Sequence, residues 1–351
     1  MAACRRWKES NFGSRKPTIN DVADIAEVSK KTVSRVINES PLVNKATRDG
    51  IQLIIDQIGY RPDPQARGLA LRRSYLVGLI YDNPNPQYVV NIQLGILDGL
   101  RGTGFELVVH PCDRKSESFI EDARRFIELQ KLYGVVVTPS VSEDERLAEA
   151  LRDIGCEYVR IASVALDQDK RMIVTNDRIG GREAGKHLAK LGHTRVGMVA
   201  GRRSFRSAHE RREGFEEGLA EFGVKLLPEY VAQGDYTFES GLARGAELFD
   251  LDPPPTAVFA ANDEMAVGVI QSALVAGLKV PDELSVVGFD NFQTATRIWP
   301  RLTTVKTPSR EVGMMAARQL LSAAHDTTIE IAQNQVIPEL VRRDSSRKPP
   351  D

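Results

Sequence analysis

The chain has 351 residues, of which 42% are hydrophobic and 27% charged, a composition typical of a soluble protein with two or three domains. No run of about 18 consecutive apolar residues occurs, so the sequence predicts no transmembrane helix. The net charge of -1 conceals an asymmetry: residues 1–74 carry 14 Lys and Arg against 8 Asp and Glu, whereas the remaining residues carry 33 against 40. A basic segment joined to an acidic body favours a nucleic-acid reader fused to a sensor, because the acidic body discourages other contacts with DNA.

The first 17 residues are rich in Arg and Lys, and no apolar run follows that could form the core of a signal peptide. We interpret residues 1–17 as a disordered basic arm. The three cysteines, Cys4, Cys112 and Cys156, stand alone and show neither disulfide nor metal-ligand spacing. Isolated cysteines are typical of proteins in a reducing compartment, so we expect a cytoplasmic protein.

Two short helices separated by a three-residue turn are predicted over residues 18–38. Thr18 followed by Asp21 is typical of a helix start, and Ser29 has the position of a cap for the second helix. Apolar residues spaced i, i+3 and i+4 give the second helix a buried face and leave hydrogen-bond donors on the other. Donors at the N-terminal end of such a helix suit major-groove readout, because base edges and phosphates present mostly acceptors there. We expect DNA contacts from Thr18, Ser29, Lys30, Lys31, Thr32, Ser34, Arg35 and Asn38.

The helix pair carries a pattern of Asp-Val-Ala at 21–23, Val-Ser at 28–29 and Thr-Val-Ser-Arg-Val at 32–36. This pattern resembles the N-terminus of the lactose-repressor/galactose-repressor (LacI) family. One position departs from the family: the turn residue that is usually Gly is Glu27, which costs about 1 kcal/mol if its backbone is left-handed. A helix pair that only packs within an α/β domain would explain the spacing, but not the further matches below.

A third helix is predicted over residues 45–58, with isoleucines facing the core and Gly59 at its end. Gly50 in its interior is expected to weaken the helix by roughly 1 kcal/mol relative to Ala. Together the three helices predict a minimal helix-turn-helix DNA-binding domain over residues 18–60.

Residues 61–74 contain two prolines and then a short run rich in Ala, Arg and Leu. In the LacI family the equivalent segment is a hinge that becomes helical only on operator DNA, where leucines wedge into the minor groove. The resemblance implies DNA contacts from Ala66 and Leu69, since apolar wedges that kink the duplex are a known strategy. A flexible linker is the alternative interpretation.

From residue 75 onward, short apolar runs alternate with helical patterns. The predicted strands span 76–80, 106–109, 135–137, 158–161, 196–199, 257–259 and 285–287, and the predicted helices span 87–101, 117–131, 144–153, 206–222 and 263–276. This rhythm is typical of a parallel sheet with right-handed crossovers and predicts two doubly wound α/β halves. Such halves bind a small ligand in the crevice at the carboxyl ends of the strands.

The family resemblance continues almost to the end of the chain, for example in Ala-Asn-Asp at 261–263 and Ser-Val-Val-Gly-Phe-Asp at 285–290. It implies a periplasmic-binding-protein-like core over 75–345, in which the chain crosses between the halves three times. The implied subdomains are 75–190 with 307–335, and 191–306 with 336–345, followed by a tail over 346–351. That tail carries no leucine heptad, so we expect a homodimer.

The resemblance also implies an effector site. Arg211 and Asp290 match the arginine and the acidic residue that contact sugar hydroxyls in the family, and a guanidinium facing a carboxylate suits a hydroxyl because it both donates and accepts. A salt bridge that ties loops together is the alternative. Tyr236 matches an aromatic residue that stacks on the ligand ring, and Asn262 would hydrogen-bond adjacent hydroxyls.

Further residues complete the predicted effector site. The usual Asp-Asn pair of the family is reversed here to Asn176-Asp177, which leaves the inner wall and the ligand type open, and we expect Asn176 to contact the effector. Asp82, Asn83 and Asn85 follow the first predicted strand of the body as further contacts, where capping of a loop is an equally good interpretation.

Motifs of enzymes are missing from the sequence. There is no complete phosphate loop and no Gly-x-Ser-x-Gly elbow, and the five histidines form no metal-type pair, so we expect neither an enzyme nor a metal or cofactor. The sequence predicts a ligand-responsive transcriptional regulator, a repressor of a carbohydrate-utilisation operon that a sugar releases from operator DNA. The alternatives are the same DNA reader with a purine, nucleoside or protein co-effector, and a plain solute-binding protein.

Overall fold

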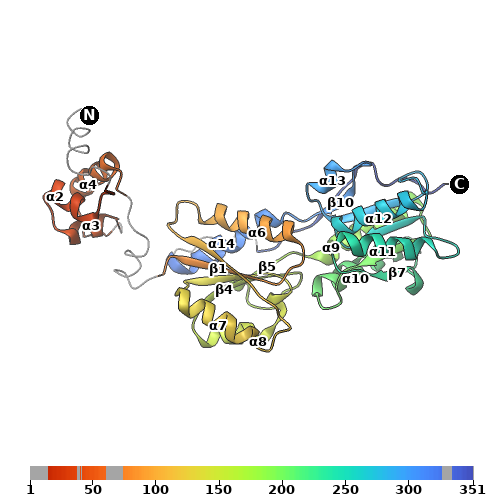
Figure 1. Cartoon of the computed structure of the whole chain (residues 1–351), viewed down its shortest axis with the longest axis horizontal. Helices are drawn as coiled ribbons and strands as arrows, with labels where there is room; N and C mark the ends of the chain where they lie inside the picture. The colour runs from red at the N-terminus through yellow and green to blue at the C-terminus, as the bar shows by residue number, and fades with distance from the viewer. Residues whose placement is uncertain (1–14, 38–39, 41, 61–73, 326–333, 351) are drawn as a thin grey trace. The chain divides into compact units, whose positions relative to one another are not determined.

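The computed structural model describes residues 15–37, 40, 42–60, 74–325 and 334–350, and its contacts divide the chain into residues 1–75 and 76–351 (Figure 1). Most of the predicted basic arm and nearly all of the hinge lie outside the described residues. The same holds for three of the predicted DNA contacts, Asn38, Ala66 and Leu69.

The described residues of the N-terminal unit form three helices, as the sequence predicts: α2 (Ile19–Ile25), α3 (Lys30–Ile37) and α4 (Lys45–Ile58). The Asp21 carboxylate accepts a hydrogen bond from the backbone N–H of Thr18 at 2.7 Å, and the Ser29 hydroxyl accepts one from that of Thr32 at 3.1 Å. These bonds satisfy orphan backbone donors at the helix starts. One small core unites the three helices, built from Val22, Ala23, Val33, Val36, Ile51, Ile55 and Ile58.

The turn between α2 and α3 is left-handed at Glu27, where φ is 51°. The left-handed backbone on which the expected cost of about 1 kcal/mol depends is therefore present in the fold.

Gly50 lies in the interior of α4, and a Cβ built on it would meet nothing within 4 Å. We therefore expect Gly50→Ala to stabilise the N-terminal unit by about 1 kcal/mol, because alanine restricts the unfolded chain and favours the helix without a clash. Hydrogen exchange of the α4 amides in the full chain should slow about fivefold. Unchanged exchange would mean that α4 does not unfold with the unit.

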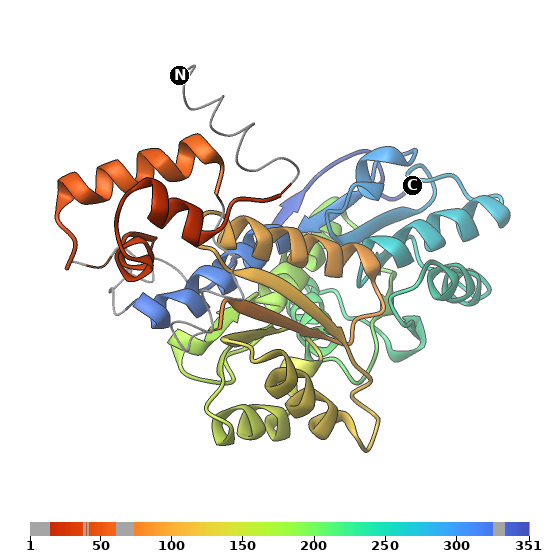
Figure 2. The ribbon, with the colours of Figure 1, turned by 60° about the vertical axis from the view of Figure 1, so that its left-hand side comes forward.

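The first lobe of the body is a parallel sheet of five strands in the order β2-β1-β3-β4-β5. Helices α6 and α14 lie on one face of this sheet, and α7 and α8 lie on the other (Figures 1 and 2). The elements are β1 (Leu76–Tyr81), α6 (Pro86–Leu100), β2 (Glu106–Pro111), α7 (Phe119–Gln130), β3 (Gly134–Val137), η1 (Val141–Glu143), α8 (Glu145–Asp153), β4 (Glu157–Ala162), η2 (Asp169–Arg171), β5 (Met172–Val174) and α14 (Ser309–His325).

The second lobe is a sheet of six strands in the order β11-β10-β9-β8-β6-β7, in which only the edge strand β11 is antiparallel. Helices α9 and α10 pack against each other, as do α11 and α12. The elements are α9 (Asp177–Leu191), β6 (Val196–Ala200), α10 (Arg206–Ala220), η3 (Pro228–Tyr230), β7 (Val231–Gln233), α11 (Phe238–Phe249), β8 (Ala257–Ala260), α12 (Asp263–Val275), β9 (Ser285–Asp290), α13 (Thr294–Arg297), β10 (Thr303–Lys306) and β11 (Glu339–Val341).

The two lobes are joined where β5 leads into α9, where β10 leads into α14, and where residues 334–338 lead into β11. Helix α9 packs on α10, β10 and β11. Residues 177–190 therefore belong to the second lobe, and their assignment to the first subdomain was wrong. The boundary was misplaced because only Thr175 and Asn176 separate α9 from the last strand of the first sheet.

Glycines bring the helices of each pair into backbone contact. A Cβ on Gly181 of α9 would lie 2.2 Å from the carbonyl oxygen of Arg211 in α10, and one on Gly214 of α10 would lie 1.9 Å from that of Arg178 in α9. Gly95 of α6 and Gly241 of α11 meet the backbones of α14 and α12 in the same way. Any larger residue would separate these helices.

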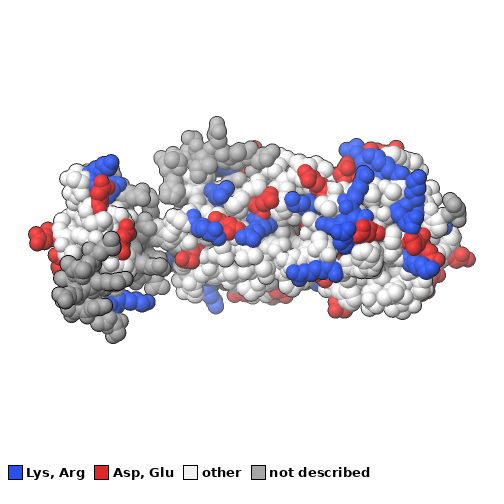
Figure 3. Space-filling model, turned by 90° about the horizontal axis from the view of Figure 1, so that it is seen from above, with Lys and Arg blue, Asp and Glu red and all other residues white. Residues whose placement is uncertain are grey.

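The surface of the body carries both signs of charge. Basic and acidic side chains lie close together over the face shown in Figure 3, and several form ion pairs, such as Arg178 with Glu217 and Arg310 with Asp98. Within the described ranges, no helix has the length and apolar character needed to cross a membrane.

Candidate ligand pocket and DNA-reading helix

A pocket lies between the two lobes of the body, at the carboxyl ends of their strands. Its volume of about 50 Å³ is enough for a few water molecules, whereas small-molecule sites usually measure several hundred Å³. The lobes must therefore part, or side chains must move, before a ligand enters. The pocket is lined by Asn83, Asn85, Tyr88, Pro139, Thr175, Asp177, Phe205, Ser207, Arg211, Tyr236, Asn262, Asp290, Phe292, Thr307 and Ser309.

Arg211 is the central charged group of the pocket and is buried. Its Nε donates to Asp177 Oδ1 at 2.7 Å, Nη1 donates to the carbonyl of Ala261, and Nη2 lies 3.5 Å from Asp290 Oδ1. The guanidinium also lies over the ring of Phe289, 3.8 Å from its centroid. Arg211 and Asp290 thus form an ion pair within the protein, as the salt-bridge alternative states. Both groups also line the pocket, as the effector-site prediction requires.

Asn176 does not line the pocket. Its backbone is left-handed, with φ at 51°, and its Nδ2 donates to the carbonyl of Val336 at 3.0 Å. The next residue, Asp177, occupies the inner wall, where its carboxylate also accepts a hydrogen bond from the hydroxyl of Thr175. The residue at the inner wall is therefore Asp177 and not Asn176, which was predicted to contact the effector. The reversed Asn-Asp order was the signal that could have identified Asp177.

Asp82 also does not line the pocket, whereas Asn83 does. Asn83 Oδ1 accepts from the backbone N–H of Asn85 at 2.9 Å, and Asn85 Oδ1 caps α6 by accepting from that of Gln87 at 3.0 Å. The side-chain oxygens of Asn83 and Asn85 therefore cap the loop and the helix, as the alternative interpretation states. The Nδ2 of Asn85 is buried at the pocket without a hydrogen-bond partner, so it could donate to a ligand.

The other two predicted contacts lie in the pocket wall. Asn262 Oδ1 accepts from the backbone N–H of Met265 at 2.9 Å, and its Nδ2 donates to the carbonyl of Tyr236 at 3.0 Å. Its amide therefore caps α12 and holds Tyr236, which limits the hydrogen bonds it can offer to a ligand. The ring of Tyr236 packs beside Phe205 with centroids 5.6 Å apart.

Several pocket residues were not predicted, because strands and loops far apart in the sequence bring them together. They are Tyr88, Pro139, Thr175, Asp177, Phe205, Ser207, Phe292, Thr307 and Ser309.

Burial raises the pKa of Asp290 to about 7; the Arg211 guanidinium opposes this shift, and Asp177 adds to it. A free aspartate ionises near pH 3.9, so between about pH 4 and 7 the folded protein holds a proton that the unfolded chain has released. The contribution of Asp290 to stability therefore falls as pH rises through this window.

We expect the melting temperature of Asp290→Asn, relative to that of the unchanged protein, to rise between pH 5 and pH 8, because asparagine never ionises. Thermal unfolding at several pH values measures this difference. Asp250→Asn, which alters an exposed residue at the end of α11, is the control and should show no such trend. A pH-independent difference for Asp290→Asn would contradict the prediction.

The predicted DNA-reading residues gather around the start of α3. Ser29, Lys30 and Lys31 are exposed, and Thr32, Ser34 and Arg35 are partly exposed along the helix, whereas Val33 and Val36 are buried. Thr18 lies before α2 and is partly exposed. The polar and apolar faces of α3 are therefore divided as the sequence predicts.

Comparisons with known proteins identify the architecture. Residues 18–63 match the model described as bacterial regulatory proteins, lacI family, and residues 186–346 match the periplasmic binding protein-like domain. The HTH-type transcriptional regulator CelR of Thermobifida fusca is 32% identical over 94% of this chain and 98% of its own length, and the regulator DegA of Bacillus subtilis is 31% identical over the same shares. The chain belongs to the LacI family.

Solved structures of LacI-family proteins agree with this assignment. The lac repressor dimer bound to operator and the anti-inducer ONPF has a TM-score of 0.77 at 25% identity, and the complex of CelR with cellobiose has a TM-score of 0.69 at 29% identity. Both comparisons cover 94% of this chain and 99% of the other. The predicted family and fold class are confirmed, and the chain is a DNA-binding transcriptional regulator rather than an enzyme.

Proposed function

We propose that this LacI-family regulator is a repressor that leaves operator DNA when an uncharged sugar binds between its two lobes. The observation that carries the proposal is the charge balance of the pocket, in which one guanidinium faces the carboxylates of Asp177 and Asp290. An acidic or phosphorylated ligand would bring a further negative charge against Asp177, with which Arg211 is already paired, and against Asp290 wherever that group is ionised. A neutral polyol can instead donate hydroxyls to the carboxylates.

Two further observations support a sugar. Aromatic rings, among them Tyr88, Tyr236 and Phe292, line the pocket and can cover the apolar face of a sugar ring. A related regulator, CelR, has been solved with cellobiose. The second candidate is a nucleoside, because the same rings suit a flat base.

The effector experiment is a thermal-shift screen of matched ligands: glucose with glucuronate and glucose 6-phosphate, the same sets for other hexoses, cellobiose, and nucleosides. We expect a neutral sugar to stabilise the protein, by about 2.7 kcal/mol at 100 times its dissociation constant, and to release it from promoter DNA. The charged partner of that sugar should do neither. Stabilisation by the acid alone, or by nucleosides alone, would overturn the proposal.

The proposed regulator acts in the cytoplasm as a homodimer on the operator of a carbohydrate-utilisation operon. Support for a second copy comes from α6, where Val90, Leu94 and Leu97 lie at i, i+4 and i+7 and are each more than 40% exposed. Apolar side chains in this spacing form a strip on one face of a helix, which association would remove from water.

We propose that Lys31 makes a base contact and that the other exposed polar residues of α3 help to position the helix. Lys31→Ala should weaken binding to the cognate operator by roughly 1 to 3 kcal/mol and binding to random DNA by less. Titrations of both DNAs at one salt concentration measure the difference. Lys225→Ala removes the same charge from an exposed position in the second lobe and should leave both affinities unchanged. Equal losses on the two DNAs would make Lys31 a phosphate contact.

A further inference from the structure

A buried arginine lies in the first lobe behind the pocket. Arg160 of β4 is 2% exposed, although its neighbours along the strand are largely apolar. A buried guanidinium is stable only when its donors are well paired. Arg160 Nε donates to the carbonyl of Ser142 at 2.7 Å, and Nη1 donates to Glu145 Oε2 at 3.1 Å and lies 3.5 Å from Asp167 Oδ2. One side chain therefore joins three segments of the lobe.

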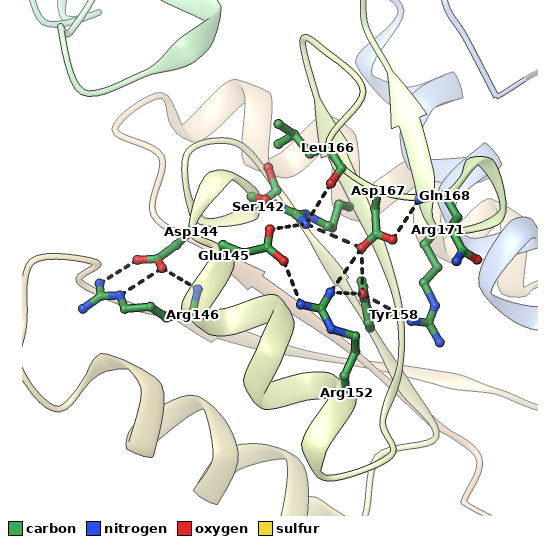
Figure 4. Close-up of polar contacts among 11 residues, drawn as sticks. Ser142, Asp144, Glu145, Arg146, Arg152, Tyr158, Leu166, Asp167, Gln168 and Arg171 are labelled. Carbon is green, nitrogen blue, oxygen red and sulfur yellow. Dashed lines mark hydrogen bonds and ion pairs between the residues drawn. The ribbon is translucent and has the colours of Figure 1, made fainter.

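The acceptors of Arg160 are themselves fixed by neighbours (Figure 4). Arg152 donates to Glu145 Oε1 at 2.7 Å and to the hydroxyl of Tyr158 at 3.1 Å. Tyr158 donates to Asp167 Oδ2 at 2.7 Å. Both carboxylates are thus held toward the guanidinium, so its position is set by a connected network rather than by one bond.

The segment that this network holds is η1, between β3 and α8. Besides accepting from Arg160, Ser142 donates its hydroxyl to the carbonyl of Ile161 at 2.6 Å. Two side-chain hydrogen bonds, both made with β4 residues, therefore fix η1 from behind. Pro139, which lines the pocket, lies just before this segment.

The front of the same segment meets the second lobe. Glu143 Oε2 accepts from the backbone N–H of Arg206, the first residue of α10, at 3.1 Å. Arg114 donates to the carbonyl of Ser140 at 3.0 Å and to that of Ser204 at 2.9 Å. These contacts join the lobes beside the pocket.

Helix α10 depends on this contact because its own N-cap is Phe205, whose side chain makes no capping hydrogen bond. A phenylalanine cannot satisfy the orphan N–H groups of the first turn, whereas a carboxylate can, and it also interacts favourably with the helix dipole. Glu143 thus caps α10 from the opposite lobe. The helix carries Ser207 and Arg211 into the pocket.

We propose that Arg160 is a positioning residue for lobe closure, which holds η1 so that Glu143 caps α10 across the cleft. The contact between Glu143 and Arg206 is made by the protein alone. Only its purpose, to hold the lobes closed around the effector, rests on the proposed function. A residue that merely stabilised the first lobe would leave the start of α10 unaffected. The effect of a substitution on α10 therefore distinguishes a positioning role from local stabilisation of the first lobe.

The experiment is hydrogen exchange of the full chain without ligand, read at single amides, with the Arg206 amide as the reporter and the β8 amides as the reference within the second lobe. Arg160→Met and Glu143→Ala should each speed exchange at Arg206 at least tenfold and leave β8 unchanged. Arg160→Lys, which keeps the charge but loses the guanidinium geometry, should have an intermediate effect. Arg124→Met is the matched control, because Arg124 pairs with Asp153 in the same lobe without contacting η1, and it should change nothing at Arg206.

Two results would overturn the proposal. Faster exchange confined to β4 and α8 in Arg160→Met would make Arg160 a local stabiliser of the first lobe. Unchanged exchange at Arg206 in Glu143→Ala would show that no cap crosses the cleft. If the amides of Arg160→Met exchange fast in both lobes, the variant is globally destabilised and Arg160→Lys is used in its place. Exchange at Arg206 and exchange in β4 and α8 are then compared in that variant. Because no ligand is used, these outcomes do not depend on the effector screen.

Discussion

Replacement of Arg211 by alanine is expected to abolish the effector response and to destabilise the body by about 3 to 5 kcal/mol. Without the guanidinium, Asp177 and Asp290 remain buried together with no counter-charge, and leaving a buried charge unpaired is costly. For a body of this size the loss corresponds to a melting temperature lower by about 10 °C. Asp290 can partly relieve the repulsion by taking up a proton, so the loss should be smaller at pH 5 than at pH 8.

Thermal unfolding at the two pH values measures the loss, and operator titration with and without the sugar from the effector screen measures the response. Adding Asp177→Asn to Arg211→Ala should restore part of the stability but none of the response, because it removes a repelling charge without replacing the guanidinium. A melting temperature that does not fall in Arg211→Ala would contradict the ion-pair account.

Gly181→Ala is expected to have the second large effect. The new Cβ would lie 2.2 Å from the carbonyl oxygen of Arg211, and this atom belongs to the backbone of α10 and cannot turn away. The helices must therefore separate, which should destabilise the body by about 1 to 3 kcal/mol or more. Because α10 carries Arg211 and Ser207, the sugar should also bind more weakly.

Thermal unfolding and sugar titration together test this prediction. Gly50→Ala is the control, since the same substitution in open space should stabilise the N-terminal unit and leave the melting temperature of the body and the sugar affinity unchanged. Wild-type sugar affinity in a destabilised Gly181→Ala would show that α10 can shift without disturbing the pocket.

The N-terminal helices and most strands could be predicted because local chemistry specifies them. Caps at Thr18 and Ser29 and regular apolar spacing mark the helices, and uniformly buried strands such as β3 form short continuous apolar runs. Helices α9, α11 and α14 were not predicted. Gly181 and Gly241, which weaken the helical signal of α9 and α11, are required by contacts with α10 and α12 that no local pattern reveals.

The pocket was predicted only in part for a related reason. Arg211 and Asp290 belong to family patterns and were found, whereas Asn176 and Asp177 are adjacent polar residues, and the sequence does not show which of the two faces the pocket. The left-handed backbone at Asn176 decides this, turning its side chain toward Val336. Phe292 and Tyr88 enter the pocket from opposite lobes, so only the assembled fold could place them together.

The order in which the chain crosses between its lobes affects how it can fold during synthesis. Helix α14 covers one face of the first sheet, yet its residues leave the ribosome after nearly the whole second lobe. Until then the face of α6 that packs on α14 has no final partner. The last strand of the first sheet ends at Val174 and α14 begins at Ser309, so the nascent first lobe stays incomplete while residues 175–308, about 135 residues, are made. Synthesis proceeds at roughly 5 to 20 residues per second. For that interval native contacts do not protect this face from aggregation.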